Sequence, residues 1–121
     1  MEREEFIAKA RKKLIGTWRS DRDRTMKNWV FPKRIAAEKL RYFERIFGKN
    51  TWRFTPRLCF GEYEDTKSRT KYEILWADNW SVVVLFKEKD GETCHHLFFE
   101  EDNFYVVAGR AGNAEYFKRV A

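Results

Sequence analysis

The two histidines are the residues of this chain best suited to acid–base or metal chemistry, and they are adjacent, at His95 and His96. The segment around them has the alternation typical of a strand, so the two imidazoles are expected on opposite faces and cannot bind one metal ion together. Cys94, His96 and Glu100 share a face, but three ligands along one strand span more than a small ion can gather. We therefore expect no metal site and no cofactor, and ordinary hydrogen-bonded strand histidines.

Nucleophiles and carboxylate pairs are present, but without the neighbours that catalysis needs. Three serines lie in no nucleophile-elbow motif: Ser20, Ser68 and Ser81. Cys94 and His95 are neighbours whose side chains must diverge, so they cannot form a nucleophile–base pair. Glu62 and Glu64 share a strand face, as acid–base carboxylates can, but an exposed charged face explains them better. The prediction is a protein that is not an enzyme.

Positive charge is concentrated in the first half of the chain. The net charge is +6, with 17 Lys or Arg against 7 Asp or Glu in residues 1–60 and 8 against 12 in residues 61–121. Such asymmetry can mark a polyanion-binding surface. Four cations, Arg53, Arg57, Arg69 and Lys71, lie among four aromatics, Trp52, Phe54, Phe60 and Tyr72, a mixture found in single-strand nucleic-acid binders. Alternation sends most of these aromatics inward and the cations outward, so we expect the aromatics in the core and the cations on a solvated face. Contacts with nucleic acid are therefore expected to be only non-specific.

Two helices are expected to flank or interrupt the strands that carry these residues. An amphipathic pattern predicts a helix over 1–14, with Phe6, Ala10 and Leu14 on one stripe. A second helix is expected over 33–47, after Pro32 and before Gly48 in the usual C-terminal position. Its apolar stripe predicts a cap over the mouth of the domain, and Lys33 and Arg34 are expected at the rim.

The rest of the chain has the period-two pattern and regular turns of a β-meander. Nine segments are expected as strands: 15–20, 24–31, 51–55, 58–64, 69–77, 80–88, 92–100, 104–107 and 115–120. Such a set predicts a mainly β fold, an antiparallel up-and-down β-barrel of about eight to ten strands in a single domain over 1–121. Segment 80–88 is apolar on both faces, so the N-terminal helix is expected to cover its outer face.

The run Gly16-Thr17-Trp18, which opens the first expected strand, resembles the calycin superfamily, the lipocalins and fatty-acid-binding proteins. The run 16–21, the helix ending Phe47-Gly48-Lys49 and the strand Thr51-Trp52-Arg53-Phe54-Thr55 are also similar to small bacterial lipocalin-like proteins of unassigned function. The resemblance implies a barrel whose closed end is plugged by Trp18 beneath a basic residue near the last strand. Arg119 is the best candidate for that residue and Arg110 the second.

These features favour a binding protein that holds a small, mostly apolar ligand in the barrel interior, such as a hydrophobic or fatty-acid-like molecule. The residues expected to line the site are Trp29, Trp52, Phe54, Tyr72, Ile74, Trp76, Val84, Phe86 and Tyr105. The alternative is a barrel filled by its own side chains, because an eight-stranded interior is just wide enough either to be packed or to hold one small ligand. Such a barrel would act as an interaction module for protein or nucleic acid through its basic half. The N-terminus has no apolar run of signal-peptide or membrane-span type, so a cytoplasmic location is expected.

Overall fold

The computed structural model describes residues 2–101, 103–107 and 113–120. Eight antiparallel strands close into one barrel in which each strand pairs with its sequence neighbours and β1 pairs with β8. The strands are β1 (Gly16–Ser20), β2 (Asn50–Phe54), β3 (Leu58–Tyr63), β4 (Thr66–Ala77), β5 (Ser81–Glu88), β6 (Gly91–Glu100), β7 (Asn103–Val107) and β8 (Ala114–Arg119). The predicted mainly β barrel is therefore confirmed, with eight strands.

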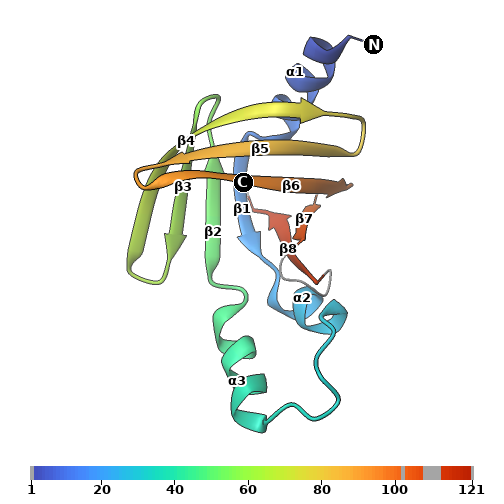
Figure 1. The fold of residues 1–121 in the computed structure, drawn as a ribbon, viewed down its shortest axis with the longest axis vertical. Helices are drawn as coiled ribbons and strands as arrows, with labels where there is room; N and C mark the ends of the chain where they lie inside the picture. The colour runs from blue at the N-terminus through green and yellow to red at the C-terminus, as the bar shows by residue number, and fades with distance from the viewer. Residues whose placement is uncertain (1, 102, 108–112, 121) are drawn as a thin grey trace.

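The helix α1 (Arg3–Leu14) lies at one end of the barrel (Figure 1). Its residues Ala10 and Leu14 are buried in the same core cluster as Trp18, Val82 and Leu97. The expectation that α1 covers the outer face of 80–88 is wrong, because its apolar stripe packs into the end of the barrel. There it removes from water the side chains that an open barrel end would expose.

The segment expected as a strand over 24–31 is instead a helix, α2 (Arg22–Asn28), followed by irregular chain. Asp21 is the N-cap, and its carboxylate accepts a hydrogen bond from the Arg24 backbone N–H at 3.2 Å. Thr25 is fully buried against β8, and its hydroxyl accepts a hydrogen bond from the Tyr116 N–H at 3.0 Å. The capping carboxylate and this docking outweigh the apolar alternation that predicted a strand.

The helix α3 (Ala37–Ile46) is shorter than the expected 33–47 and does not cap the barrel. It extends away from the barrel at the end opposite α1 (Figure 1), and none of its residues is buried. Its apolar stripe packs on the preceding chain: the Phe43 ring centroid lies 6.0 Å from that of Trp29 and 5.4 Å from that of Phe31. We call residues 22–47 the α2–α3 hairpin. It is a projection with its own small aromatic cluster.

Aromatic side chains fill the middle of the barrel. The rings of Trp52 and Phe117 stack with centroids 4.6 Å apart, and the rings of Phe104 and Phe117 stack at 5.0 Å. The Trp18 ring meets Phe104 edge to face at 4.6 Å. These side chains come from four neighbouring strands, β7, β8, β1 and β2, so they form a continuous aromatic core along that half of the barrel.

A β-bulge in β4 reverses the outward and inward faces of its last residues. Ile74 pairs with Val84, but Trp76 pairs with Val83, so the register shifts by one residue between them. Ile74 is buried whereas Trp76 is 45% exposed. The expectation that Trp76 lines the interior with Tyr72 and Ile74 is wrong, because the extra residue of a bulge moves every later side chain to the opposite face.

Candidate ligand-binding site

A cavity of about 110 Å³ lies inside the barrel, towards the end formed by the β3–β4 and β5–β6 turns. This end is opposite the β4–β5 turn, which lies beside α1. The residues that line the interior pocket are Trp52, Cys59, Gly61, Ser68, Thr70, Phe86, Glu88 and His95. They come from five consecutive strands, so the pocket is a feature of the closed barrel rather than of one hairpin.

Three rings converge on this interior pocket. The His95 centroid lies 5.4 Å from that of Phe86 and 6.5 Å from that of Trp52, and the Trp52 and Phe86 centroids are 6.0 Å apart. Burial lowers the pKa of His95, while the nearby Glu88 carboxylate acts in the opposite direction. His95 is therefore neutral at pH 7 and offers one hydrogen-bond donor and one acceptor between two aromatic walls.

Gly61 creates the free space in the pocket. It pairs with Trp52 on one side and Ser68 on the other, and a Cβ at this position would lie 2.6 Å from Ser68 Oγ and 3.9 Å from the Trp52 ring. Any larger residue would therefore project into the interior and occupy the cavity. The absence of a side chain at Gly61 is what separates this pocket from a fully packed barrel.

Cys59 is the one buried thiol among the described residues, and its environment opposes nucleophilic chemistry. Burial raises the pKa of the Cys59 thiol to about 12. At pH 7 the thiol is protonated, and a protonated thiol is a weak nucleophile. Cys94, the other cysteine, is exposed on the outer surface, and the two are free thiols.

A half-buried carboxyl on β8, that of Glu115, was not anticipated. Ser20 Oγ donates a hydrogen bond to Glu115 Oε2 at 2.6 Å, and the Gly48 N–H donates to Ser20 Oγ at 3.0 Å. Burial raises the pKa of Glu115, although the Ser20 hydrogen bond acts against this rise. Alternation could have signalled both side chains, since Ser20 shares a face with Trp18 and Glu115 shares one with Phe117. These two hydrogen bonds connect the base of the α2–α3 hairpin to strands β1 and β8 of the barrel.

At the α1 end, Arg119 covers Trp18. The guanidinium carbon lies 4.2 Å from the Trp18 ring centroid, and Arg119 donates hydrogen bonds to the carbonyl of Ile15 at 3.0 Å and to that of Lys13. Trp18 is 1% exposed, and its Nε1–H donates to the Leu14 carbonyl at 2.8 Å. This is the pair that the resemblance implied. Gly16, with φ of 140°, begins β1 directly after α1, and Arg110 lies outside the described residues.

The structure brings only some of the expected lining residues together. Trp52 and Phe86 line the interior pocket. The residues Phe54, Tyr72, Ile74 and Val84 are buried in the barrel core but are not among the residues that line it. Trp29 packs on Phe47 in the α2–α3 hairpin with centroids 5.0 Å apart, because its segment is not a strand. Tyr105 pairs with Phe98 and Tyr116 along the backbone, and its side chain lies outside the described part of the chain.

His95 and His96 lie on opposite faces, as expected. His96 Nε2 is 2.8 Å from Ser81 Oγ on the outside of the barrel, and its ring stacks on Phe98 with centroids 4.1 Å apart. Within the described residues no group of three or more metal-binding side chains is assembled. No helix in the same part of the chain is long and apolar enough to cross a membrane.

The fold and this pocket define a closed, eight-stranded antiparallel β-barrel with a small internal cavity, an architecture compatible with the calycin type. Comparisons with protein-family models, with curated proteins and with solved structures find no match to this chain.

Proposed function

We propose that this protein is a non-catalytic binding protein of calycin type that holds a small, uncharged ring compound in the interior pocket. The observation that carries the proposal is the convergence of Trp52, Phe86 and His95 on a cavity that Gly61 keeps open. Aromatic walls with a few convergent polar groups are typical of small-molecule sites.

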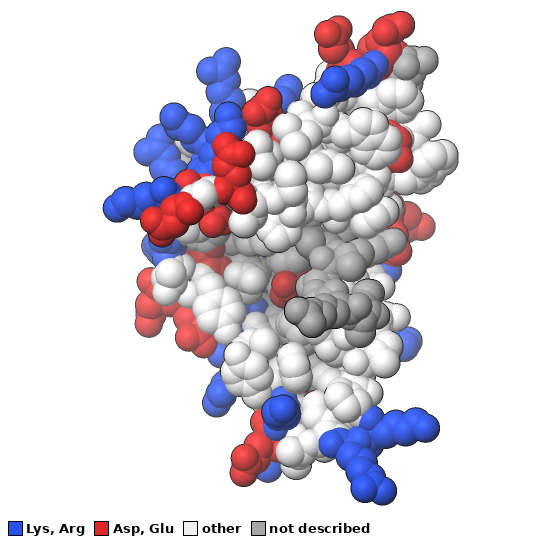
Figure 2. All heavy atoms as spheres, in the orientation of Figure 1, with Lys and Arg blue, Asp and Glu red and all other residues white. Residues whose placement is uncertain are grey.

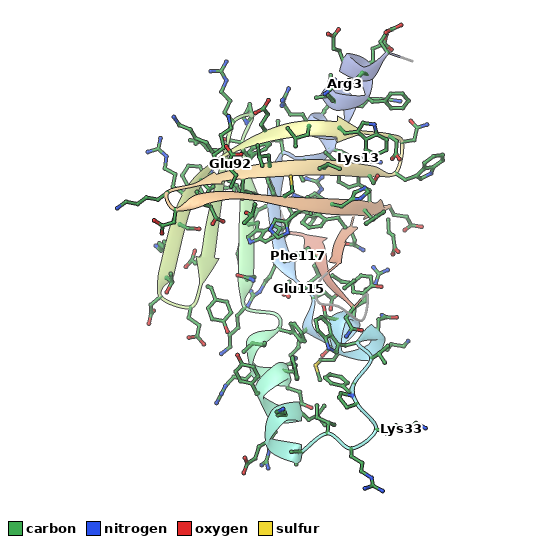
Figure 3. All side chains as sticks on the ribbon, viewed as in Figure 1. Arg3, Lys13, Lys33, Glu92, Glu115 and Phe117 are labelled. Carbon is green, nitrogen blue, oxygen red and sulfur yellow. The ribbon has the colours of Figure 1, made fainter. Side chains whose placement is uncertain are left out.

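The size of the pocket limits the ligand. An apolar cavity of about 150 Å³ holds benzene, and the 110 Å³ here is smaller, so the pocket has room for at most one small ring of five or six atoms. A long-chain fatty acid exceeds this volume, and Lys33, expected at the rim, instead lies far from the barrel on the α2–α3 hairpin (Figure 3). The volume therefore favours a ring over the expected fatty-acid-like ligand.

The charge of the pocket also selects the ligand. Glu88 is the one carboxylate among the lining residues, and no Lys or Arg lines the cavity. An anionic ligand would be repelled by Glu88 without a compensating cation. A neutral ring with a hydroxyl or an N–H group can stack on Trp52 and Phe86 and exchange a hydrogen bond with His95.

Titration with phenol, followed by amide chemical shifts in NMR, tests the proposal, with benzoate as the anionic comparison. We expect phenol to bind with Kd of about 0.1–1 mM, since the ligand has few atoms, and to shift the amides around Gly61 and His95. Benzoate should bind at least fivefold more weakly. Gly61→Val should abolish phenol binding by filling the cavity, whereas Glu62→Ala, a change to the next side chain on the outer face, should leave it unchanged.

These measurements distinguish a ligand-binding barrel from a barrel that is filled by its own side chains. A melting temperature close to that of the wild type shows that Gly61→Val is folded, so that loss of binding reports on the cavity. If about 10 mM phenol causes no amide shift, the binding free energy is under 3 kcal/mol. That result would refute the ligand-binding proposal. Equal binding by wild type and Gly61→Val would do the same.

A second candidate function, an interaction module for polyanions, is favoured by the α2–α3 hairpin. Residues 22–47 contain eight Lys or Arg and three Asp or Glu. Figure 2 shows cationic side chains at this projecting end, and Val30 is 70% exposed beside them. If the hairpin binds RNA or heparin, affinity must fall steeply with added salt, because binding releases counterions. We expect the protein to bind RNA and heparin only weakly and without sequence preference. Sequence-selective RNA binding at physiological salt would instead favour the interaction module over the ligand-binding barrel.

A further inference from the structure

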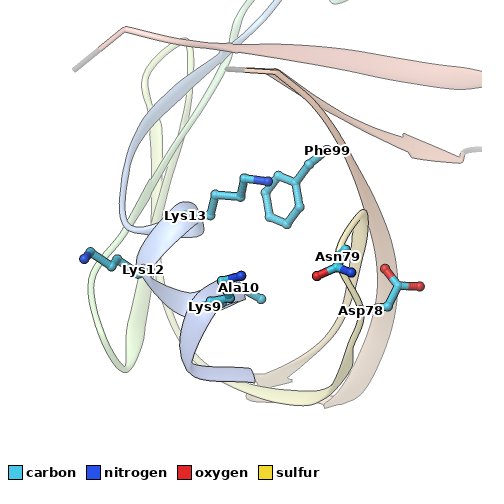
Figure 4. A pocket seen from close by; sticks show the side chains of 7 residues that line it. All are labelled: Lys9, Ala10, Lys12, Lys13, Asp78, Asn79 and Phe99. Carbon is cyan, nitrogen blue, oxygen red and sulfur yellow. The ribbon is translucent and has the colours of Figure 1, made fainter. Parts of the chain in front are cut away.

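A second cavity lies at the other end of the barrel, between α1 and the β4–β5 turn (Figure 4). Its volume is about 270 Å³. We call it the α1 pocket, and the residues that line it are Lys9, Ala10, Lys12, Lys13, Asp78, Asn79 and Phe99. It exists because α1 fills only part of the barrel end. It is separate from the interior pocket, with which it shares no lining residue.

The α1 pocket combines an apolar wall with lysine side chains. Ala10, which is 4% exposed, and the half-buried Phe99 connect it to the hydrophobic core. Lys13 Nζ lies 5.1 Å from the Phe99 ring centroid. Figure 4 shows Lys13 reaching across to Phe99, with Lys9 on the same side of the helix, whereas the Lys12 side chain points away from the cavity.

The acidic group of the pocket does not neutralise these cations. Asp78 Oδ1 accepts hydrogen bonds from the backbone N–H groups of Trp80 at 2.8 Å and Ser81 at 2.7 Å. Its carboxylate points away from α1 in Figure 4. Among the described residues, neither Lys9 nor Lys13 forms an ion pair. Within the described part of the chain, the ammonium groups of Lys9 and Lys13 therefore line the pocket without an ion-pair partner.

We propose that the α1 pocket binds a small amphiphilic carboxylate, such as a medium-chain fatty acid. The carboxylate would lie between the ammonium groups of Lys9 and Lys13, and the hydrocarbon would replace water against Phe99 and Ala10. The volume is just below the range of about 300–1,000 Å³ of drug-sized sites. This size fits a chain of medium length better than a long one.

Octanoate is the probe, titrated into the full chain at low ionic strength and followed by amide shifts and calorimetry. We expect shifts of the amides of α1, Asn79 and Phe99. The double change Lys9→Gln with Lys13→Gln should weaken binding at least fivefold, whereas Lys33→Gln with Lys39→Gln, which removes the same two charges from the α2–α3 hairpin at the opposite end of the barrel, should weaken it less than twofold. Octan-1-ol should bind at least fivefold more weakly than octanoate and should not respond to the lysine changes.

An occlusion variant provides an independent check. Asn79 is exposed at the edge of the pocket and its amide points towards α1 (Figure 4), so Asn79→Phe should fill the α1 pocket without disturbing the core and abolish octanoate binding. Phenol binding at the interior pocket should persist in this variant, which keeps the two sites distinguishable.

Three results would overturn the inference. The first is no octanoate shift up to about 10 mM. The second is an equal loss from Lys33→Gln with Lys39→Gln and from Lys9→Gln with Lys13→Gln, which would indicate general charge attraction rather than a site. The third is octanoate shifts confined to Gly61 and His95, which would place the carboxylate in the interior pocket.

Discussion

Arg119 should contribute to stability through Trp18 and through the end of α1 together. The substitution Arg119→Met keeps the aliphatic stem and removes the guanidinium, which lies 4.2 Å from the Trp18 centroid and donates hydrogen bonds to the carbonyls of Lys13 and Ile15. These carbonyls belong to the last turn of α1 and the residue after it, where backbone acceptors lack partners within the helix. The variant therefore loses both a ring contact and a helix cap.

The expected loss in the free energy of unfolding depends on how exposed these contacts are. A cation over an indole at a partly exposed site contributes about 0.5–1 kcal/mol, and a cation at a helix C-terminus about another 0.5 kcal/mol. Ile15 is 37% exposed, so water can replace the lost hydrogen bonds and each contributes only about 0.5 kcal/mol. The expected loss is about 2 kcal/mol, or a fall in Tm of roughly 6–10 °C for a chain of this size.

Urea unfolding of a double-mutant cycle isolates the ring contact. Trp18→Leu removes the indole and leaves the Leu14 carbonyl without its 2.8 Å hydrogen bond. Trp18→Ala should lower the stability more than Trp18→Leu does, by about 3–5 kcal/mol relative to the wild type. If the guanidinium stabilises the indole directly, Arg119→Met should cost about 1 kcal/mol less in the Trp18→Leu background than in the wild type.

Two results would refute this reasoning. A loss below about 0.5 kcal/mol for Arg119→Met would show that water replaces all the contacts of the guanidinium. Additive losses in the cycle would show that Arg119 acts only on the end of α1, and the Trp18 contact would then have no energetic role.

Three further predictions concern the barrel and its connection to the α2–α3 hairpin. Gly48→Ala should destabilise by about 1–3 kcal/mol, measured by urea unfolding, because Gly48 has φ of +87° and an added Cβ would lie 2.9 Å from Arg22 Cβ; an unchanged midpoint would contradict this. Because burial raises the pKa of Glu115 in the folded chain, the stability linked to its protonation is complete below the unfolded value of 4.5 and is lost as pH rises through the folded pKa. Glu115→Gln should therefore be more stable than wild type at pH 7 and lose that advantage below pH 4.5 in thermal melts across pH, and a constant difference would count against it. Trp76→Gln should change stability by less than about 0.5 kcal/mol, whereas Ile74→Ala, two positions away on the inner face, should cost about 2–5 kcal/mol; similar losses would argue against the bulge.

The barrel was predictable because it depends on short-range patterns, and the pair at its α1 end because Gly16-Thr17-Trp18 resembles a known motif. Alternation over 69–74 sends Tyr72 and Ile74 inward, and the turns recur often enough to predict consecutive antiparallel strands. The resemblance implied that Trp18 lies beneath a basic residue near the last strand, with Arg119 as the first candidate, and this is the contact observed. The face of a strand residue follows from its position in the sequence, so long as the strand stays regular.

The missed features depend on interactions that a local pattern does not contain. The segment 24–31 alternates, yet capping by Asp21 and docking of Thr25 onto β8 make its first part a helix. Trp76 points outward because of a bulge that no residue type announces. The stripe of α3 was identified correctly but assigned to the wrong partner, since its contacts are with Trp29 and Phe31.

The sequence by itself determined the fold class, the alternation of the strands, the basic first half and the absence of any spacing typical of a catalytic motif. Only the tertiary structure decided how much of the interior stays open, because that depends on how Trp52, Phe104 and Phe117 from three strands stack together. It likewise decided that Gly61 opens a small pocket and that α1 leaves a second one, lined by Lys9 and by Lys13 above Phe99. Cavities are what remains after side chains distant in sequence have packed, so no local pattern can encode their volume.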